Sequence, residues 1–168
     1  MGPLKGELKG GEFVVGDGAE ELHEKGYGEL KGGMLRLLGY EAIYLAYTGR
    51  VEFFKGRRLG FSELVREATK LDPNAWTKFI VYRDLRDRGY VVKDGFGIGV
   101  DLRVYERGEY GKKPAKYLVF VLREGERMGS AELSEAVERI IRLGKIPLVA
   151  VVERRGEVIY YRLGRMRF

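Results

Sequence analysis

The chain has 168 residues, of which 45% are hydrophobic and 33% are charged, so it is long enough for one compact domain or two small ones. No apolar run approaches the roughly 18–20 residues of a membrane-spanning helix, and the first residues lack an apolar signal-peptide core. We therefore expect a cytoplasmic protein without a membrane partner. Cysteine is absent and His23 is the only histidine, which excludes disulfides, cysteine nucleophiles and multi-histidine metal sites.

The charge balance is basic. Lys and Arg total 31 against 25 acidic residues, which gives a net charge of +6. An excess of this size favours a polyanionic partner, most commonly a nucleic acid. A surface rich in ion pairs, as in thermophile proteins, has the same composition, so charge alone leaves both interpretations open.

The first third of the chain is rich in glycine, which is typical of short strands joined by tight turns. Residues 5–10 and 27–32 share the core GELKG, and we interpret them as two similar hairpin-like pieces. Between them, Ala19 to Lys25 predicts a short helix that ends at Gly26.

The next segment alternates helix and strand. Residues 40–48 predict a helix and residues 51–54 a strand. Ser62 is a plausible N-cap for a helix that runs to about Lys70. A turn at Asp72-Pro73-Asn74 closes this part, so we predict an N-terminal α+β domain over residues 1–73.

The second half has more regular patterns. Residues 75–88 predict a helix whose apolar side carries Trp76, Phe79, Ile80 and Val81. Two strands are expected next, over residues 90–93 and 99–106, the second with strict alternation of apolar and polar positions.

Two continuous apolar runs, residues 117–122 and 146–152, predict buried strands. Between them Ser130 is the expected N-cap of a helix with an apolar stripe from Leu133 to Ile141. Residues 157–162 give a last strand. The order helix, three strands, helix, two strands predicts an α/β, nuclease-like C-terminal domain over residues 74–168, with a mixed sheet flanked by helices.

Four stretches occur together in a characteristic order. Residues 40–45 read YEAIYL, residues 81–90 read VYRDLRDRGY, residues 99–105 read GVDLRVY and residues 148–152 read LVAVV. In this order they resemble the archaeal tRNA-splicing endonuclease family, and the resemblance covers roughly residues 35–163.

The resemblance implies a specific reaction. Members of the family cut bulge-helix-bulge RNA without a metal or other cofactor, and they leave a 2′,3′-cyclic phosphate and a 5′-hydroxyl. A ribose 2′-oxygen attacks the neighbouring phosphorus, which requires a base, an acid and a cation near the developing charge. The family uses tyrosine, histidine and lysine for these tasks.

Only two of these three residues have a counterpart here. Tyr105 matches the family tyrosine and Lys145 the family lysine, but Pro114 stands at the histidine position. Losing a general acid costs about 10²–10⁴-fold in rate. We therefore expect Tyr105 and Lys145 to be remnants and the chain alone to be a poor nuclease. From the residues alone, Tyr105 reads as an ordinary strand tyrosine and Lys145 as a helix-end cation.

Several basic residues are candidates for RNA binding. The set is Arg103, Arg107, Lys112, Lys113, Lys116 and Arg139. They could contact phosphates in any RNA-binding protein. The family also clamps a flipped base with arginines, one of them seven residues before the lysine. That position is Glu138 here, and the neighbouring Arg139 points about 100° away on a helix, so we do not expect the clamp to form.

The resemblance also implies partners. Some family enzymes are heterotetramers in which a structural subunit without a working triad supports a catalytic subunit. We expect this role here, with precursor tRNA as the RNA partner. The last strand would pair across a subunit interface through Val158, Ile159, Tyr160, Tyr161 and Leu163, because an open apolar edge strand is an aggregation hazard. The family's acidic docking loop corresponds to residues 153–157, which are mixed in charge here.

Three other functions stay open. The chain could be a self-sufficient homo-oligomeric endonuclease, if another group replaces the histidine. It could be a metal-dependent nuclease that uses Asp101, although no Glu-x-Lys follows on the next strand. It could also be a basic RNA-binding scaffold with no part in cleavage.

Overall fold

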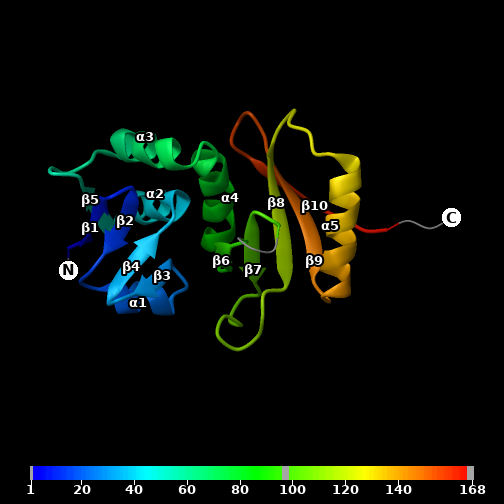
Figure 1. Ribbon diagram of the computed structural model, residues 1–168, viewed down its shortest axis with the longest axis horizontal. Coiled ribbons are helices and arrows are strands. Elements are labelled where there is room, and N and C mark those ends of the chain that lie inside the picture. Colours follow the sequence, from blue (N-terminus) through cyan, green and yellow to red (C-terminus); the bar gives the residue numbers. More distant parts are fainter. Residues whose placement is uncertain (1, 96–98, 166–168) are drawn as a thin grey trace. The chain divides into compact units, whose positions relative to one another are not determined.

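The computed structural model describes residues 2–95 and 99–165 (Figure 1). The chain divides into two compact units, Met1–Arg83 and Asp84–Phe168, and the boundary falls within helix α4 (Ala75–Asp87). Each unit contains one five-stranded sheet flanked by helices, which confirms the predicted fold class. Within the described ranges, no helix has both the length and the apolar character needed to cross a membrane.

The first unit has the sheet order β3-β4-β2-β1-β5, in which only β1 and β5 are parallel. Its elements are β1 (Leu4–Lys9), β2 (Glu12–Val15), α1 (Ala19–Glu24), β3 (Glu29–Lys31), β4 (Met34–Leu37), α2 (Gly39–Tyr47), β5 (Val51–Phe54) and α3 (Phe61–Leu71). The two GELKG pieces each begin a hairpin, β1-β2 and β3-β4, as the sequence predicts.

Aromatic side chains fill the core of this unit. The rings of Phe13 on β2 and Phe53 on β5 meet edge to face at 5.6 Å. Tyr82, on α4, packs against Tyr40 and Tyr44 of α2 at ring distances of 5.2 and 5.4 Å. Such pairs add about 0.5–1.5 kcal/mol each to the stabilisation from burial, so they join the helices into one core.

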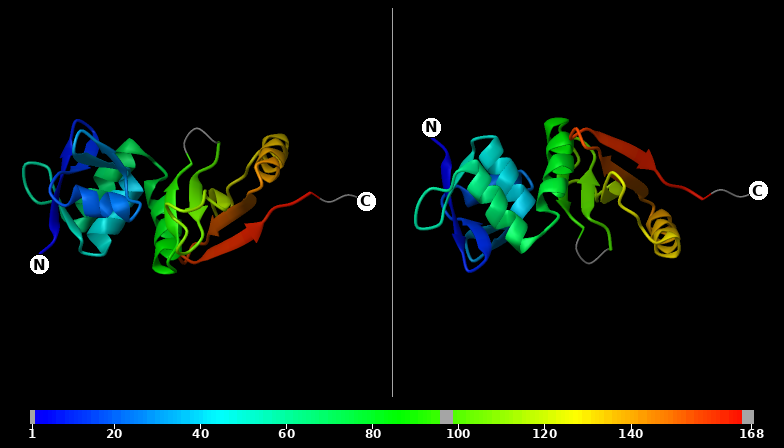
Figure 2. Two further views of the ribbon diagram at one scale, coloured as in Figure 1. Left: turned by 90° about the horizontal axis from the view of Figure 1, so that it is seen from below. Right: turned by 90° about the horizontal axis from the view of Figure 1, so that it is seen from above.

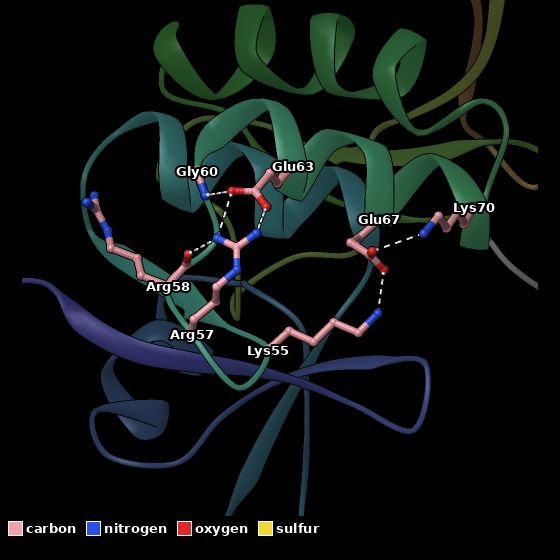
Figure 3. A network of polar contacts seen from close by, with 7 residues as sticks. All are labelled: Lys55, Arg57, Arg58, Gly60, Glu63, Glu67 and Lys70. Atoms are coloured by element: carbon pink, nitrogen blue, oxygen red, sulfur yellow. Dashed lines mark hydrogen bonds and ion pairs between the residues drawn. The ribbon is translucent and has the colours of Figure 1, made fainter.

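Helix α3 begins one residue before Ser62, which the sequence analysis named as its N-cap. The N-cap is Gly60, whose amide donates to the Glu63 carboxylate at 3.1 Å. Arg57 also pairs with that carboxylate, as Figure 3 shows. The prediction of Ser62 as N-cap is therefore wrong. The Glu63 side chain accepts a hydrogen bond from the Gly60 amide, so the helix starts at Phe61, one residue earlier than Ser62.

The predicted apolar side of α4 is correct except at its first turn. Phe79 and Val81 are fully buried and Ile80 nearly so. Trp76 keeps 42% of its surface exposed, since it lies at the rim of the unit with its ring against Phe61 and Phe79.

The second unit has the sheet order β10-β9-β8-β7-β6. Its strands and remaining helix are β6 (Val91–Asp94), β7 (Leu102–Tyr105), β8 (Tyr117–Arg123), α5 (Ser130–Arg142), β9 (Ile146–Val152) and β10 (Val158–Arg162). Strands β8 and β9 are parallel because α5 carries the chain back between them, and the other pairs are antiparallel. The predicted element order is confirmed.

Helix α5 covers one face of this sheet, as Figures 1 and 2 show. Its Ala136 and Ile140 pack against Leu118, Phe120 and Val149 of β8 and β9. The N-cap of α5 is Gly129, and Ser130 is the first helical residue, so that capping prediction is wrong by one position. Gly129 adopts the extended conformation of an N-cap, and it makes no side-chain hydrogen bond to the helix.

Candidate active site

One end of the second sheet collects Tyr105, Pro114 and Lys145, the three positions that the resemblance predicts to correspond to catalytic residues. Strand β7 ends with Tyr105, and the loop that follows contains Pro114 and leads into β8 (Figure 1). Val104 pairs with Tyr117, and Tyr117 pairs with Ile146, the residue after Lys145. The end of β7 and the starts of β8 and β9 are therefore neighbours.

Lys145 is half-buried at this end and is tied to the loop. Its ammonium donates to the backbone carbonyl of Ala115 at 2.5 Å, one residue after Pro114. The lysine thus fastens the start of β9 to the segment that leads into β8. Pro114 itself is exposed and has no group that could transfer a proton.

Tyr105 lies between an aromatic ring and a cation. Its ring meets that of Tyr110 edge to face at 4.9 Å. Arg103, two residues earlier and hence on the same face of the strand, donates to the Tyr105 hydroxyl over a long 3.5 Å contact. The guanidinium is held in place because its Nε donates to the carbonyl of Asp94 at 2.7 Å.

A carboxylate that the sequence analysis did not single out completes this end of the sheet. Glu106 accepts from the Lys116 ammonium at 3.0 Å and from the Tyr117 hydroxyl at 3.4 Å. The hydrogen bond from Lys116, followed by that from the Arg107 amide, lowers the pKa of Glu106, and Glu106 in turn raises the pKa of Lys116. The only signal in the sequence is an acid directly after Tyr105, ahead of a lysine-rich loop.

The structure brings five of the six RNA-binding candidates to β7 and the loop after it. Arg103 and Lys116 are engaged as described, and Arg107 stacks over the Tyr90 ring at 5.1 Å. Lys112 and Lys113 are exposed on the loop. These residues give that end of the sheet a basic rim.

Arg139 lies elsewhere, on α5. Its Nη2 is 3.7 Å from the position that a Cβ on Gly99 would occupy, before β7 begins, whereas Tyr105 ends that strand. The neighbouring Glu138 pairs with Arg165 at 3.4 Å. An acid in an ion pair thus occupies the position at which the resemblance predicts a clamp arginine.

The unit that carries these residues has no histidine, because His23 belongs to α1 of the first unit. Across residues 2–95 and 99–165, no three His, Cys, Asp or Glu side chains are grouped so that they could hold a metal ion. A ligand at this end of the sheet would therefore meet the cationic, aromatic and carboxylate side chains described above.

Comparison with known proteins gives consistent matches over the whole fold. The family model described as tRNA intron endonuclease, N-terminal domain, matches residues 4–65, and that of the catalytic C-terminal domain matches residues 75–160. A tRNA-splicing endonuclease of Pyrococcus furiosus is 36% identical over 150 residues, which cover 88% of this chain and 86% of the relative.

Two further relatives carry the same description. One from Methanococcus vannielii is 36% identical over 153 residues, covering 90% of this chain and 86% of the relative. One from Methanosarcina acetivorans is 34% identical over 164 residues, covering 95% of this chain but 46% of the relative. The similarity therefore extends over both units, and the last relative has additional sequence outside the matched part.

Proposed function

Because the chain belongs to the tRNA intron endonuclease family, we propose that it is a structural subunit of a tRNA-splicing endonuclease. In this role it assembles with a catalytic subunit into a heterotetramer and helps to bind bulge-helix-bulge precursor tRNA. The proposal depends on Pro114, which the resemblance aligns with the family's catalytic acid and which directly precedes the Ala115 carbonyl that Lys145 binds.

The neighbouring side chains do not replace the missing acid. Glu106 has a lowered pKa, so at neutral pH it is ionised and has no proton to donate. Lys116 has a raised pKa, which makes an amine that is already a weak acid still weaker. Even if Tyr105 acted as the base and the Lys145 ammonium as the cation, the leaving 5′-oxygen would have no proton donor. The chain alone would then be slower by about 10²–10⁴-fold.

Lys145 supports a structural role for this pocket. Its hydrogen bond to the Ala115 carbonyl orders the loop. An inactive site needs an ordered loop as much as an active one does. Lys145→Ala should lower the free energy of unfolding by about 1–2 kcal/mol, because a charged hydrogen bond is lost. It should leave the cleavage rate of a reconstituted complex within about twofold. A loss of tenfold or more in rate, with the complex still assembled, would mean that Lys145 acts in catalysis.

Strand β10 supports the assembly part of the proposal. It is the outer edge of the second sheet (Figure 2) and carries Ile159 and Tyr161 with exposed fractions of 39% and 53%. Val158, Tyr160 and Leu163 are half-buried, and Leu163 packs against the core of its own unit, so Ile159 and Tyr161 are the side chains that we assign to a partner. An apolar edge strand of this kind is stabilised when another strand covers it.

The test is cleavage of a bulge-helix-bulge RNA in EDTA, by the chain alone and after co-purification with a candidate catalytic subunit. We expect no measurable cleavage alone and full activity in the complex. The matched variant is Pro114→His, assayed alone. Metal-independent cleavage by the unmodified chain would overturn the proposal and favour a self-sufficient enzyme, in which another group supplies the proton.

A further inference from the structure

Four aromatic side chains and one arginine lie together on the first unit, and the proposed function gives them no role. They are Tyr47 on α2, Phe61 on α3, and Trp76, Phe79 and Arg83 on α4. Ring centroids lie 5.1 Å apart for Trp76 and Phe79, 5.8 Å for Tyr47 and Phe79, and 6.4 Å for Phe61 with Tyr47 and with Trp76. We call this group the aromatic patch.

Three rings of the aromatic patch face solvent. The exposed fractions are 53% for Tyr47, 40% for Phe61 and 42% for Trp76, whereas Phe79 is fully buried beneath them. Single exposed apolar residues are common on proteins, whereas adjoining exposed rings form a candidate binding surface. Phe79 provides a fixed base, so the three exposed rings are supported from below.

The aromatic patch also contains a cation without a counter-ion. The Arg83 guanidinium lies 5.4 Å from the Tyr47 ring centroid and 5.3 Å from that of Phe79. Among residues 2–95 and 99–165, its side chain forms no ion pair and no hydrogen bond. A planar cation that stacks on rings and keeps its N–H groups available suits a phosphate.

The aromatic patch is pre-ordered on the α3 side. Phe61 is the first residue of α3, and the ion pair of Arg57 with Glu63 fixes the start of this helix together with the Gly60 amide (Figure 3). Glu67, one turn on from Glu63, accepts from Lys55 and Lys70 at 3.2 and 3.1 Å. A ring on an anchored helix loses little conformational freedom when it binds a ligand.

We propose that the aromatic patch is a stacking platform for unpaired bases of single-stranded RNA, with Arg83 bound to an adjacent phosphate. The proposal rests on the proposed function, which gives the chain an RNA partner. It adds a candidate RNA site on the first unit to the basic rim of the second. Exposed rings beside an arginine bind unpaired nucleotides without sequence preference. An apolar protein surface would leave Arg83 without an anion, whereas every nucleotide of RNA supplies one.

Trp76 makes the proposal directly measurable, since it is the only tryptophan of the chain. A base stacked on the indole quenches its fluorescence. We expect a ten-nucleotide unstructured RNA to quench the emission of the full chain, and an RNA duplex of the same length to quench it far less, because paired bases are not free to stack.

Two kinds of variant separate the rings from the charge. Tyr47→Ala and Trp76→Ala should each weaken binding by about tenfold or more, with little change in salt dependence. Arg83→Gln should weaken binding and also reduce the slope of log affinity against log salt by about 0.7, the value for one phosphate of a single strand. Labelled RNA and anisotropy serve for Trp76→Ala, which lacks the fluorophore.

The controls are Leu71→Ala, an exposed apolar residue of α3, and Arg66→Gln, an exposed arginine of the same helix. Both should bind RNA as the unmodified chain does, and circular dichroism should be unchanged in all variants. Equal losses in the controls would reduce the effect to general charge or stability and would overturn the proposal.

Other outcomes would also overturn it. No quenching by the single strand, or equal quenching by the duplex, would exclude base stacking at Trp76. A shift of the emission on adding the catalytic subunit or more of the chain, without RNA, would make the aromatic patch a protein interface. If a complex with a catalytic subunit cleaves precursor RNA but the oligonucleotide fails to bind, only this inference fails. Binding of the oligonucleotide without any rescue of cleavage would reject only the proposed subunit role.

Discussion

Glu41 is a carboxylate with only 3% of its surface exposed, so it needs hydrogen-bond donors within the first unit. Its two oxygens accept from the amides of Leu38 and Gly28, each at 2.8 Å, so it fixes the start of α2 and the turn before β3 together. Glu41→Gln keeps the shape but presents an amide group to one of the two donors. We expect a loss of about 2–3 kcal/mol in the free energy of unfolding, measured by urea denaturation.

The matched control for Glu41 is Glu63→Gln on α3. Glu63 holds the same position relative to its helix and also accepts from an amide, that of Gly60, but its side chain keeps 33% of its surface exposed. Its loss should be clearly smaller, because an exposed amide regains its hydrogen bond from water. Equal losses at the two positions would contradict the importance that we give to burial at Glu41.

Glu106 gives a pH-dependent prediction. The hydrogen bond from Lys116 lowers the pKa of this carboxyl below its ordinary value of about 4.3. The ionised form is thus favoured in the folded chain, so the pair stabilises the fold above about pH 4.3 and stops doing so as the pH falls through the lower folded value. Carboxyl carbon chemical shifts should show this low midpoint, and Lys116→Met should move it upward. An unchanged midpoint in Lys116→Met would remove Lys116 as the cause.

At the scale of elements, a side-chain hydrogen bond joins β10 to α4. The hydroxyl of Tyr160 donates to the Asp84 carboxylate on α4 at 2.7 Å, and burial together with this carboxylate raises the pKa of Tyr160. Tyr160→Phe should lower the free energy of unfolding by about 1–2 kcal/mol. Tyr161→Phe, on the exposed side of the strand, should change it little, and thermal denaturation of both variants would decide.

The same contact predicts behaviour at high pH. A raised pKa means that the phenol of Tyr160 stays neutral in the folded chain when ordinary tyrosines ionise near pH 10. The contribution of this group to stability is therefore complete below pH 10 and is lost as the pH rises above it. Ultraviolet titration at about pH 10–11 should therefore count the same number of ionising tyrosines in the native unmodified chain and in Tyr160→Phe, whereas one more in the unmodified chain would contradict this assignment.

Apolar periodicity predicts the element order of the second unit, although the strand predicted over residues 99–106 spans only Leu102–Tyr105. In the first unit the glycine pattern predicts two hairpins, which the structure contains. The predictions err at helix starts: Ser62 and Ser130 carry good capping hydroxyls, yet Gly60 and Gly129 precede the two helices. At Gly60 the cause is Glu63, a contact that propensity does not contain. Trp76 reads as core from its spacing, but periodicity gives a direction on a helix and not the distance to the rim of the unit.

The candidate site is predictable only in part. The resemblance puts Tyr105, Pro114 and Lys145 in one pocket, and strand pairing brings their elements to one end of the sheet. The bond from Lys145 to the Ala115 carbonyl was not foreseeable, because it joins a side chain to a backbone atom 30 residues away. Glu106 was missed for a similar reason, since its partner Lys116 is reached only once the loop folds back.

At the scale of the whole molecule, assembly can be tested apart from catalysis. Ile159→Lys puts a charge on the exposed apolar side of β10, which is how natural edge strands avoid pairing. We expect the variant to fold as a single chain but to lose co-purification with the catalytic subunit and with it the rescued cleavage. Sedimentation velocity would measure the change in mass. Leu71→Lys on the first unit is the control, and a complex that survives Ile159→Lys would place the interface elsewhere.

Pro114 has a consequence for how such a subunit could change over generations. The residue is exposed on its loop, and the neighbouring carbonyl, not the proline side chain, receives the bond from Lys145. A substitution there needs no repacking of the core, so the proton donor can change without a change in the fold. A duplicated gene could lose or regain its proton donor in one mutational step while the protein remained a competent partner.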